Sequence, residues 1–301
     1  MEQTLTVEKK EIPITRVDKI FYPKTGFTKG EMIDYYIKIA PQMLKHLKGR
    51  PVSLKRYPDG VEGLFFYEKQ CPKYRPDWVN TAPVWSEQRH ANINYCLFED
   101  LPTLVWAANL AVLEIHVVLS KKAALSQPTS MVFDLDPGEG TNIVQCAAVA
   151  LKIKELFEKS SLESFPKTSG SKGMQLYVPL NSKCNFDETK AVAKHVAAVL
   201  EQEQPEHVVS KMAKVLRKGK VFIDWSQNDE HKTTVCVYSM RATETPSVST
   251  PLKWSEVKDA AGSKAKVPLR FEPKEVLARV EKFGDLFEPL LTLKQNLKSF
   301  K

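Results

Sequence analysis

The chain has 301 residues, of which 43% are hydrophobic and 27% charged, so it is long enough to bury one large core or two smaller ones. Its first residues lack the apolar run of a secretory signal, and no apolar stretch reaches the length of about 18 residues needed to span a membrane, so we expect a cytoplasmic protein. The formal charge of +8 favours a polyanionic partner such as nucleic acid, although many basic proteins bind none.

The cysteine pattern adds a prediction about redox state. The cysteines are dispersed and include no C-x-x-C pair: Cys71, Cys96, Cys146, Cys184 and Cys236. This pattern predicts reduced thiols and argues against both a disulfide framework and a zinc site.

In the first 120 residues, the pattern predicts helices and strands in mixed order. Thr28 and Glu31 form a capping box, and the apolar stripe that follows predicts a helix ending at Gly49. A second helix is expected over residues 101–112. Runs rich in β-branched and aromatic residues predict strands at 52–57, 64–67 and 113–119, with the first two joined as a hairpin around Pro58-Asp59-Gly60.

The rest of the chain shows a different pattern. Strands are predicted at 131–136, 174–180, 221–225 and 235–240, and helices at 143–157, 189–200 (capped by Asp187) and 274–283. This order predicts an α+β fold in which helices cover one face of a sheet. Residues 120–130 are the predicted joint between an N-terminal subdomain, 1–120, and a second subdomain, 121–301.

Three aspartates are candidate metal ligands. Alternation along the strand 131–136 puts Asp134 and Asp136 on one face, roughly 7 Å apart. Two carboxylates at this spacing repel each other unless a cation lies between them, and Mg²⁺ or Mn²⁺ suits oxygen ligands. Asp224, at the end of another apolar strand, is the third candidate. Taken alone, Asp-Leu-Asp-Pro-Gly is more typical of a turn than of a metal site.

A second signal is the loop Thr168-Ser169-Gly170-Ser171-Lys172-Gly173, just before a predicted strand. Small residues expose backbone N–H groups and Lys172 adds positive charge, a combination that can bind phosphate. The loop lacks the order of a Walker A motif, and alone it is more typical of a surface turn.

Further candidates combine basic and aromatic side chains. Lys55, Phe66 and Tyr67 fall in the predicted hairpin, where such a mixture suits backbone neutralisation and base stacking, or equally a solvated edge. His116 lies on an apolar strand, where a histidine is more often a core residue. Arg241 ends an apolar strand and is harder to assign to a solvated surface.

Together and in this order, these motifs resemble the polymerase domain of bacterial ATP-dependent DNA ligase D, within the archaeo-eukaryotic primase superfamily. The resemblance covers nearly the whole chain and is carried by these segments: Asp18-Lys19-Ile20-Phe21-Tyr22-Pro23, Thr28-Lys29-Gly30, Lys55-Arg56-Tyr57-Pro58-Asp59-Gly60, Phe66-Tyr67-Glu68-Lys69, Glu114-Ile115-His116, 133–138, 168–173, 222–225, 238–242 and 248–252. It implies a primase-like catalytic core, an RRM-like sheet with helices, packed against an N-terminal α/β subdomain.

The resemblance also implies roles for single residues. Asp134, Asp136 and Asp224 match the family's metal-binding carboxylates. The residues that match its nucleoside triphosphate contacts are Ser169, Lys172, His116, Arg241 and, close to the ribose, Lys55. Phe66 and Tyr67 match an aromatic pair that stacks on template bases, with Tyr67 a departure because Phe is common there. Lys19 and Lys29 match a pocket for the 5′-phosphate of a downstream DNA strand.

The activity implied by the resemblance is template-dependent nucleotidyl transfer at DNA ends. It fills short gaps in double-strand break repair by non-homologous end joining, prefers rNTP to dNTP, and uses two Mn²⁺ or Mg²⁺ ions. The implied partners are DNA ends with a 5′-phosphate, Ku and an ATP-dependent DNA ligase, in a nucleoid-associated protein of the cytoplasm. The alternatives are a primase of the same superfamily, a metal-dependent phosphoesterase and a non-catalytic DNA-end binding module.

Overall fold

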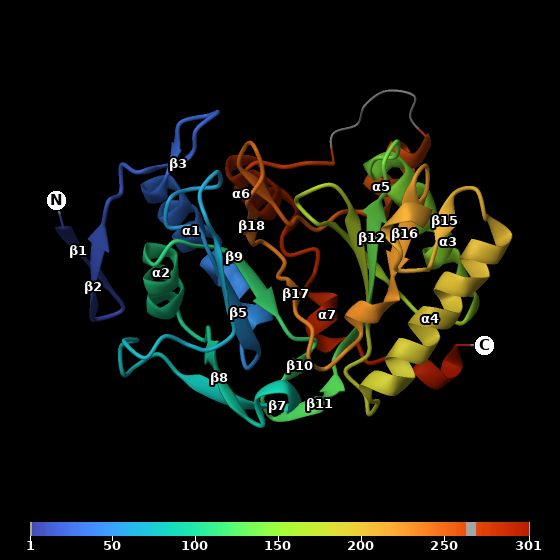
Figure 1. Cartoon of the computed structure of the whole chain (residues 1–301), viewed down its shortest axis with the longest axis horizontal. Helices are drawn as coiled ribbons and strands as arrows, with labels where there is room; N and C mark the ends of the chain where they lie inside the picture. Colours follow the sequence, from blue (N-terminus) through green and yellow to red (C-terminus); the bar gives the residue numbers. More distant parts are fainter. Residues whose placement is uncertain (1, 263–268, 301) are drawn as a thin grey trace. The chain divides into compact units, whose positions relative to one another are not determined.

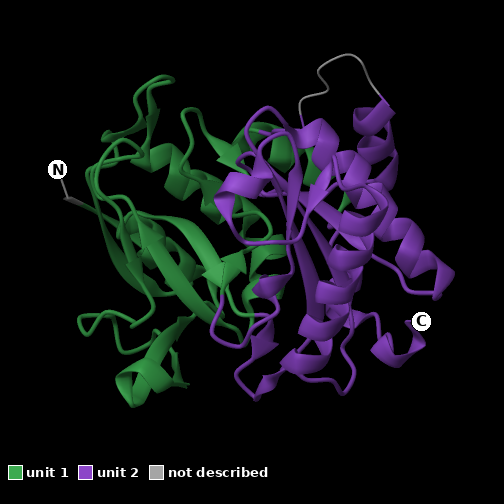
Figure 2. Cartoon of the chain, turned by 45° about the vertical axis from the view of Figure 1, so that its right-hand side comes forward, with its two compact units in different colours: residues 1–118, 233–248, 272–284 green, residues 119–232, 249–271, 285–301 purple. Residues whose placement is uncertain are grey.

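The computed structural model describes residues 2–262 and 269–300 and divides the chain into two compact units (Figures 1 and 2). Unit 1 comprises residues 1–118, 233–248 and 272–284, and unit 2 comprises residues 119–232, 249–271 and 285–301. A single division at residue 120 would instead assign 233–248 and 272–284 to the second subdomain.

Unit 1 is built mainly on an antiparallel sheet with the strand order β17-β9-β5-β8-β7, in which β6 also pairs with β5. Its elements are β1 (Glu2–Val7), β2 (Lys10–Thr15), β3 (Ile20–Tyr22), β4 (Phe27–Thr28), α1 (Lys29–Leu47), β5 (Pro51–Arg56), β6 (Phe66–Glu68), β7 (Thr81–Ser86), η1 (Glu87–Arg89), β8 (Ala91–Leu97), α2 (Leu101–Asn109), β9 (Val112–Val117), β17 (Thr234–Val235), β18 (Met240–Arg241), β19 (Ser247–Val248) and α6 (Pro273–Phe283).

Several predictions for unit 1 are confirmed. The capping box of Thr28 and Glu31 opens α1, and Asp100 accepts a hydrogen bond from Thr103 N at the start of α2. The predicted hairpin is present because β5 pairs with β6, Lys55 opposite Tyr67. The hairpin β1–β2 and the hairpin β7–β8 were missed by sequence reasoning. The predicted strand over 235–240 is wrong: the chain forms the separate short strands β17 and β18, and Tyr238 between them has a left-handed φ of 67°.

Unit 2 contains a sheet with the strand order β13-β14-β12-β16-β15. Its elements are β10 (Ser120–Lys121), β11 (Ala124–Pro128), β12 (Ser130–Pro137), α3 (Ile143–Lys159), β13 (Phe165–Thr168), β14 (Met174–Pro179), α4 (Phe186–Glu203), β15 (Val208–Val209), η2 (Lys214–Arg217), β16 (Val221–Asp224), η3 (Trp225–Gln227), α5 (Trp254–Gly262), α7 (Pro289–Thr292) and η4 (Leu297–Ser299).

The core of unit 2 lies between one face of this sheet and its helices. Phe133 and Leu135 of β12 are fully buried in a cluster with Ile153 of α3 and Val196 of α4. Both helices therefore cover the same face, and the predicted α+β class is confirmed. The predicted cap of α4 is wrong: Asn185 rather than Asp187 accepts the bond from Glu188 N, so the helix begins earlier, at Phe186.

The redox state of two cysteines also differs from the prediction. Cys71 and Cys96 form a disulfide in unit 1, with their Cα atoms 4.9 Å apart. The backbone N–H of Cys71 donates to the carbonyl of Asn94, and this hydrogen bond holds the two segments close enough for the disulfide to form. The positions of the two cysteines in the sequence did not reveal this pairing. Cys146, Cys184 and Cys236 form no disulfide, which agrees with the predicted reduced thiols, and all three side chains are buried.

No helix in the described ranges is both long and apolar enough to cross a bilayer.

Gly173 fixes the junction between the predicted phosphate loop and β12, and its replacement tests that packing. A Cβ at Gly173 would lie 2.1 Å from the carbonyl oxygen of Leu135, which is part of the central strand. We therefore expect Gly173→Ala to lower the free energy of unfolding by about 1–3 kcal/mol, measured by urea denaturation. The matched control is Gly262→Ala in α5, where a Cβ meets no heavy atom within 4 Å. Equal effects of the two changes would contradict the packing argument.

Candidate active site

The carboxylate face of unit 2 follows from the alternation along β12. Because Phe133 and Leu135 point into the helical core, Asp134 and Asp136 project from the opposite face of the sheet. Asp134 is partly buried and Asp136 is exposed. The pattern read from the sequence is thus confirmed as a strand with two carboxylates on one face.

Asp224 reaches the same part of the sheet from β16. It lies directly opposite Asp134 in the antiparallel pairing of β12 with β16. Its carboxylate accepts hydrogen bonds from the backbone N–H of Ser226 at 2.9 Å and from Gln227 Nε2 at 3.2 Å. Asp224 therefore also caps η3, which is a structural role that the sequence left open.

Electrostatic repulsion marks Asp134 as the central carboxylate. Burial, and then the negative charge of Asp136, raise the pKa of Asp134 to about 7. Two neighbours counteract this shift: the Gln175 side chain hydrogen-bonds to Asp134, and the ammonium of Lys167 lowers the pKa through its positive charge. Both lie on the same face of the sheet, because Gln175 pairs with Asp134 and Lys167 pairs with Gln175.

These residues fit a divalent cation in chemistry and in sheet position. Three carboxylates on adjacent strands offer the oxygen ligands that Mg²⁺ and Mn²⁺ prefer. Within residues 2–262 and 269–300, however, three or more Asp, Glu, His or Cys side chains are nowhere already arranged as a metal site.

The predicted phosphate loop is held in shape by Ser169. The hydroxyl oxygen of Ser169 accepts bonds from the N–H groups of Ser171 and Gly173, both at 3.2 Å. Lys172 is exposed and lines a cavity of about 640 Å³ together with Asn142 at the start of α3. An ammonium group beside a helix N-terminus favours an anion in this cavity.

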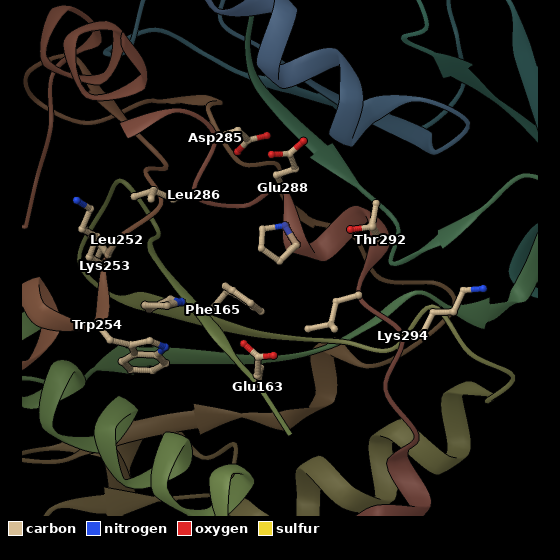
Figure 3. Close-up of a pocket in the computed structure, with 13 residues that line it drawn as sticks. Glu163, Phe165, Leu252, Lys253, Trp254, Asp285, Leu286, Glu288, Thr292 and Lys294 are labelled. Carbon is tan, nitrogen blue, oxygen red and sulfur yellow. The ribbon is translucent and has the colours of Figure 1, made fainter. Parts of the chain in front are cut away.

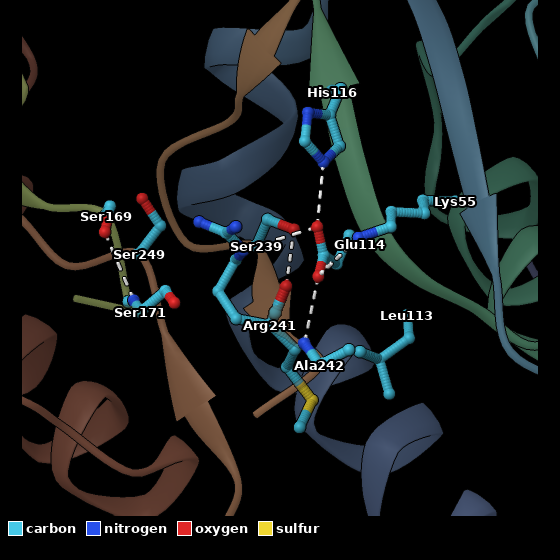
Figure 4. A network of polar contacts seen from close by, with 12 residues as sticks. Lys55, Leu113, Glu114, His116, Ser169, Ser171, Ser239, Arg241, Ala242 and Ser249 are labelled. Carbon is cyan, nitrogen blue, oxygen red and sulfur yellow. Dashed lines mark hydrogen bonds and ion pairs between the residues drawn. The ribbon is translucent and has the colours of Figure 1, made fainter. Parts of the chain in front are cut away.

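A second charged group, in unit 1, is organised around Glu114 of β9 (Figure 4). The carboxylate is only 2% exposed, and it contacts His116 Nε2 at 2.9 Å, Arg241 Nε at 3.3 Å and Lys55 Nζ at 3.4 Å. It also accepts a hydrogen bond from the backbone N–H of Ala242 at 3.0 Å. The structure thus brings together three residues predicted from the sequence, and it adds the carboxylate that joins them.

The charges around Glu114 set its protonation and that of His116. Burial opposes ionisation of Glu114, but the bond from His116 and the positive charges of Arg241 and Lys55 together hold its pKa well below the usual value. Burial lowers the pKa of His116, against the opposing effect of Glu114. At neutral pH the group is therefore an ionised glutamate with a neutral histidine and two cations.

The predicted stacking pair is exposed. Phe66 and Tyr67 of β6 keep 52% and 43% of their surface accessible, next to Leu64 at 81% and Phe65 at 55%. Large apolar side chains gathered in one short segment are typical of a binding surface. The ring of Tyr67 also lies 5.7 Å from that of His116, which connects this segment to the Glu114 group.

Lys19 and Lys29 line one cavity of about 380 Å³ in unit 1. Lys29 is almost fully buried, and its Nζ donates to the carbonyl of Thr15 and to Asn109 Oδ1, both at 2.7 Å. Burial and the charges of Arg16 and Lys19 lower the pKa of Lys29 to about 8. Arg16 and Arg56 line the same cavity, so its lining is strongly positive.

A larger cavity of about 1070 Å³ lies in unit 2 and involves none of the predicted site residues (Figure 3). Its lining includes the apolar side chains of Phe165, Trp254 and Leu286, with Glu163 and Asp285 beside them.

Sequence reasoning missed four side chains that these sites depend on: Glu114 (quoted in a motif but given no role), Lys167, Gln175 and Asn109. A glutamate inside the apolar run of β9 was the available signal for Glu114, because an unpaired buried charge is costly. The register of β13 and β14, which places Lys167 and Gln175 beside Asp134, could not be read from the sequence.

Replacing Glu114 tests the central role of its charge. We expect Glu114→Gln to lower the free energy of unfolding by about 3 kcal/mol, because it leaves Lys55 and Arg241 without their buried counter-charge. Since the pKa of Glu114 is lowered in the folded protein, this difference is fully present above about pH 5 and shrinks as the pH falls below the pKa of an unfolded glutamate, about 4.3.

Denaturation of both proteins between pH 3 and pH 8 measures the effect. The control is Glu68→Gln, which removes the more exposed partner of Arg56 in the same unit and should change stability by less than about 1 kcal/mol. A loss with Glu114→Gln no larger than that of the control would contradict the assignment.

The comparisons with known proteins agree on one family. The family model of the LigD primase-polymerase domain matches residues 28–287. The multifunctional non-homologous end joining protein LigD of Mycolicibacterium smegmatis is 40% identical over 93% of this chain and 36% of its own length. The bifunctional non-homologous end joining protein LigD of Bacillus subtilis is 32% identical over 96% of this chain and 47% of its own length. The chain thus spans between a third and a half of these relatives.

A solved structure gives the same result for the fold. The polymerase domain of Mycobacterium tuberculosis ligase D, in complex with DNA, superposes with a TM-score of 0.85 and 39% identity, covering 94% of this chain and 98% of that one. The chain belongs to the LigD primase-polymerase domain family.

Proposed function

We propose that the chain is a DNA-end-directed, template-dependent nucleotidyltransferase that fills short gaps in double-strand break repair by non-homologous end joining, preferring ribonucleotides. The observation that carries the proposal is the carboxylate face of β12 and β16, where Asp134 and Asp224 are cross-strand neighbours and burial, followed by the charge of Asp136, raises the pKa of Asp134 to about 7. The family supports it, since its relatives are non-homologous end joining proteins and one solved member is a polymerase domain in complex with DNA.

In this proposal Asp134, Asp136 and Asp224 hold two Mn²⁺ or Mg²⁺ ions. Divalent cations in such a position lower the pKa of an attacking 3′-hydroxyl and neutralise charge on the phosphates. Gln175 and Lys167 keep Asp134 in place on the sheet. Lys167 is fully buried and donates a hydrogen bond to Ser249 at 2.6 Å. We therefore assign Lys167 and Gln175 a role in orienting Asp134 and no direct contact with the substrate.

The nucleoside triphosphate is proposed to bind the basic and hydroxyl side chains described above. Lys172 supplies an exposed positive charge to the phosphates, and Ser169 fixes the loop that presents Lys172. Lys55 and Arg241 offer rigidly held positive donors, because Glu114 holds both of them together with His116. Fixed donors need no reorganisation as charge develops on the phosphates, which is how such groups accelerate phosphoryl transfer.

DNA is proposed to bind unit 1 through two features. Phe66 and Tyr67 are exposed and suit stacking on template bases. The cavity lined by Lys19 and Lys29 suits the 5′-phosphate at the downstream side of a gap. Ku and an ATP-dependent DNA ligase complete the proposed reaction as partners that bring the ends together and seal them.

A gap-filling assay tests the reaction. Wild-type protein is given a DNA gap, Mn²⁺, and either rNTP or dNTP, and we expect extension with a preference for rNTP. Asp134→Asn should reduce extension at least about 100-fold, because loss of one charged ligand removes several kcal/mol of stabilisation of the transition state. Asp259→Asn, an exposed aspartate of α5 in the same unit, is the control and should extend normally.

The same assay separates the alternatives. Synthesis on a single-stranded template without a primer would identify a primase instead. Shortening of the DNA ends would identify a phosphoesterase, and DNA binding without any synthesis would leave only an end-binding module.

The 5′-phosphate pocket gives a separate prediction. The double variant Lys19→Ala with Lys29→Ala should weaken binding to gapped DNA that carries a downstream 5′-phosphate more than binding to the same DNA with a 5′-hydroxyl, measured by fluorescence anisotropy at fixed salt. Equal losses on both DNAs would show ordinary charge attraction to the backbone and would contradict the pocket.

A further inference from the structure

Asp59 forms an ion pair with Lys19, one of the two lysines proposed to bind the 5′-phosphate. Its Oδ1 lies 2.6 Å from Lys19 Nζ, and the pair is formed by side chains that are 73% and 25% exposed, respectively. Lys29, in the same cavity, differs from Lys19, since it donates hydrogen bonds to the neutral oxygens of Thr15 and Asn109. The hydrogen bonds of Lys29 to neutral oxygens do not cancel its positive charge, whereas Asp59 neutralises the charge of Lys19.

The turn that carries Asp59 is built against the strand that follows Lys19. Val61 N donates to the carbonyl of Phe21 at 2.9 Å, which attaches the turn to β3. Gly60 has a φ of +81°, and a Cβ there would lie 2.8 Å from the oxygen of Phe21, so the approach depends on glycine. The position of Asp59 beside Lys19 is thus set by backbone contacts on both sides and does not depend on the ion pair alone.

The chemistry of the two anions decides which one Lys19 prefers. Asp59 offers a single negative charge, and its carboxylate is largely exposed, so it returns to water with little loss. A terminal phosphomonoester carries about −1.5 to −2 charge at neutral pH and has three acceptor oxygens. Such a group, held at the same time by Lys29, can displace the carboxylate from Lys19.

We propose that Asp59 is an internal competitor that occupies Lys19 in the free protein and is displaced by the 5′-phosphate of a DNA end. The inference rests on the proposed function, because it takes the cavity of Lys19 and Lys29 as the 5′-phosphate site. Its distinctive consequence is a gain of affinity on mutation. Asp59→Asn removes the competing charge and should tighten binding to gapped DNA with a 5′-phosphate about two- to fivefold, the range expected for a solvent-exposed ion pair.

A purely orienting role for Asp59 predicts the opposite change in affinity. If Asp59 served only to orient Lys19, then Asp59→Asn would leave the lysine less well placed and would weaken phosphate binding. Binding is measured by anisotropy at fixed salt, without metal or nucleotide, on gapped DNA with a 5′-phosphate or a 5′-hydroxyl. Thermal denaturation of each variant confirms that it is folded.

Two further variants exclude a general effect of net charge. Asp34→Asn removes an equivalent exposed aspartate, paired with Lys38 at 2.6 Å on α1, and changes the net charge by the same amount. It should leave the affinity unchanged. In a Lys19→Ala background, Asp59→Asn should give no gain in affinity, because the lysine for which Asp59 and the phosphate compete is absent.

Each outcome decides the inference. A gain on 5′-phosphate DNA that is smaller on 5′-hydroxyl DNA and absent in the Lys19→Ala background supports competition. A loss of affinity, an equal gain on both DNAs, or a gain that persists without Lys19 overturns it. If wild-type protein shows no preference for the 5′-phosphate, the phosphate pocket itself is wrong and the inference falls with it; a preference without a gain in Asp59→Asn leaves the pocket intact and overturns only the competitor.

Discussion

The alternation of side chains along β12 is the constraint on which the proposed chemistry depends. Phe133 and Leu135 are buried against α3 and α4, so the register of this strand is fixed by the hydrophobic cluster that these elements share. A slip by one residue would bury Asp134 and Asp136 in that cluster and expose the phenyl ring. The same packing that stabilises unit 2 therefore holds two carboxylates at a repulsive spacing, which a cation bound in the proposed site would relieve. The stability of the sheet and the placement of the proposed metal ligands come from one pattern of side chains.

The positive groups of unit 1 are prepared for an anion in three different ways. Glu114 binds Lys55, His116 and Arg241 from the buried side and so orients them. Neutral oxygens accept the hydrogen bonds of Lys29, and burial together with the charges of Arg16 and Lys19 lowers its pKa to about 8. Asp59 neutralises Lys19 from the solvent side, where it can be displaced. Orientation by Glu114 thus acts in the proposed nucleotide site, whereas burial of Lys29 and the pairing of Lys19 with Asp59 act in the proposed 5′-phosphate cavity.

The parts of this structure that follow local rules could be predicted from the sequence. The capping box of α1, the alternation of β12 and the α+β class were all readable, because each depends on residues close together in the chain. Contacts across strands could not be read: the register that places Gln175 and Lys167 beside Asp134, and the disulfide of Cys71 with Cys96, depend on segments brought together by folding. The family resemblance supplied the site residues that local patterns left undecided. It did not supply Glu114 or Asp59, whose roles appear only through their partners.

The path of the chain between the units has a consequence for how the protein can be divided. The backbone passes from one unit to the other at residues 118–119, 232–233, 248–249, 271–272 and 284–285. Neither unit is a continuous stretch of sequence, so no single cut in the chain separates one complete unit from the other. A chain ending near residue 120 would lack β18 and with it Arg241, and Glu114 would remain buried without one of its cations. Domain deletion, the usual way to assign functions within multifunctional proteins, is therefore unsuited to separating these two units, and point substitutions are required instead.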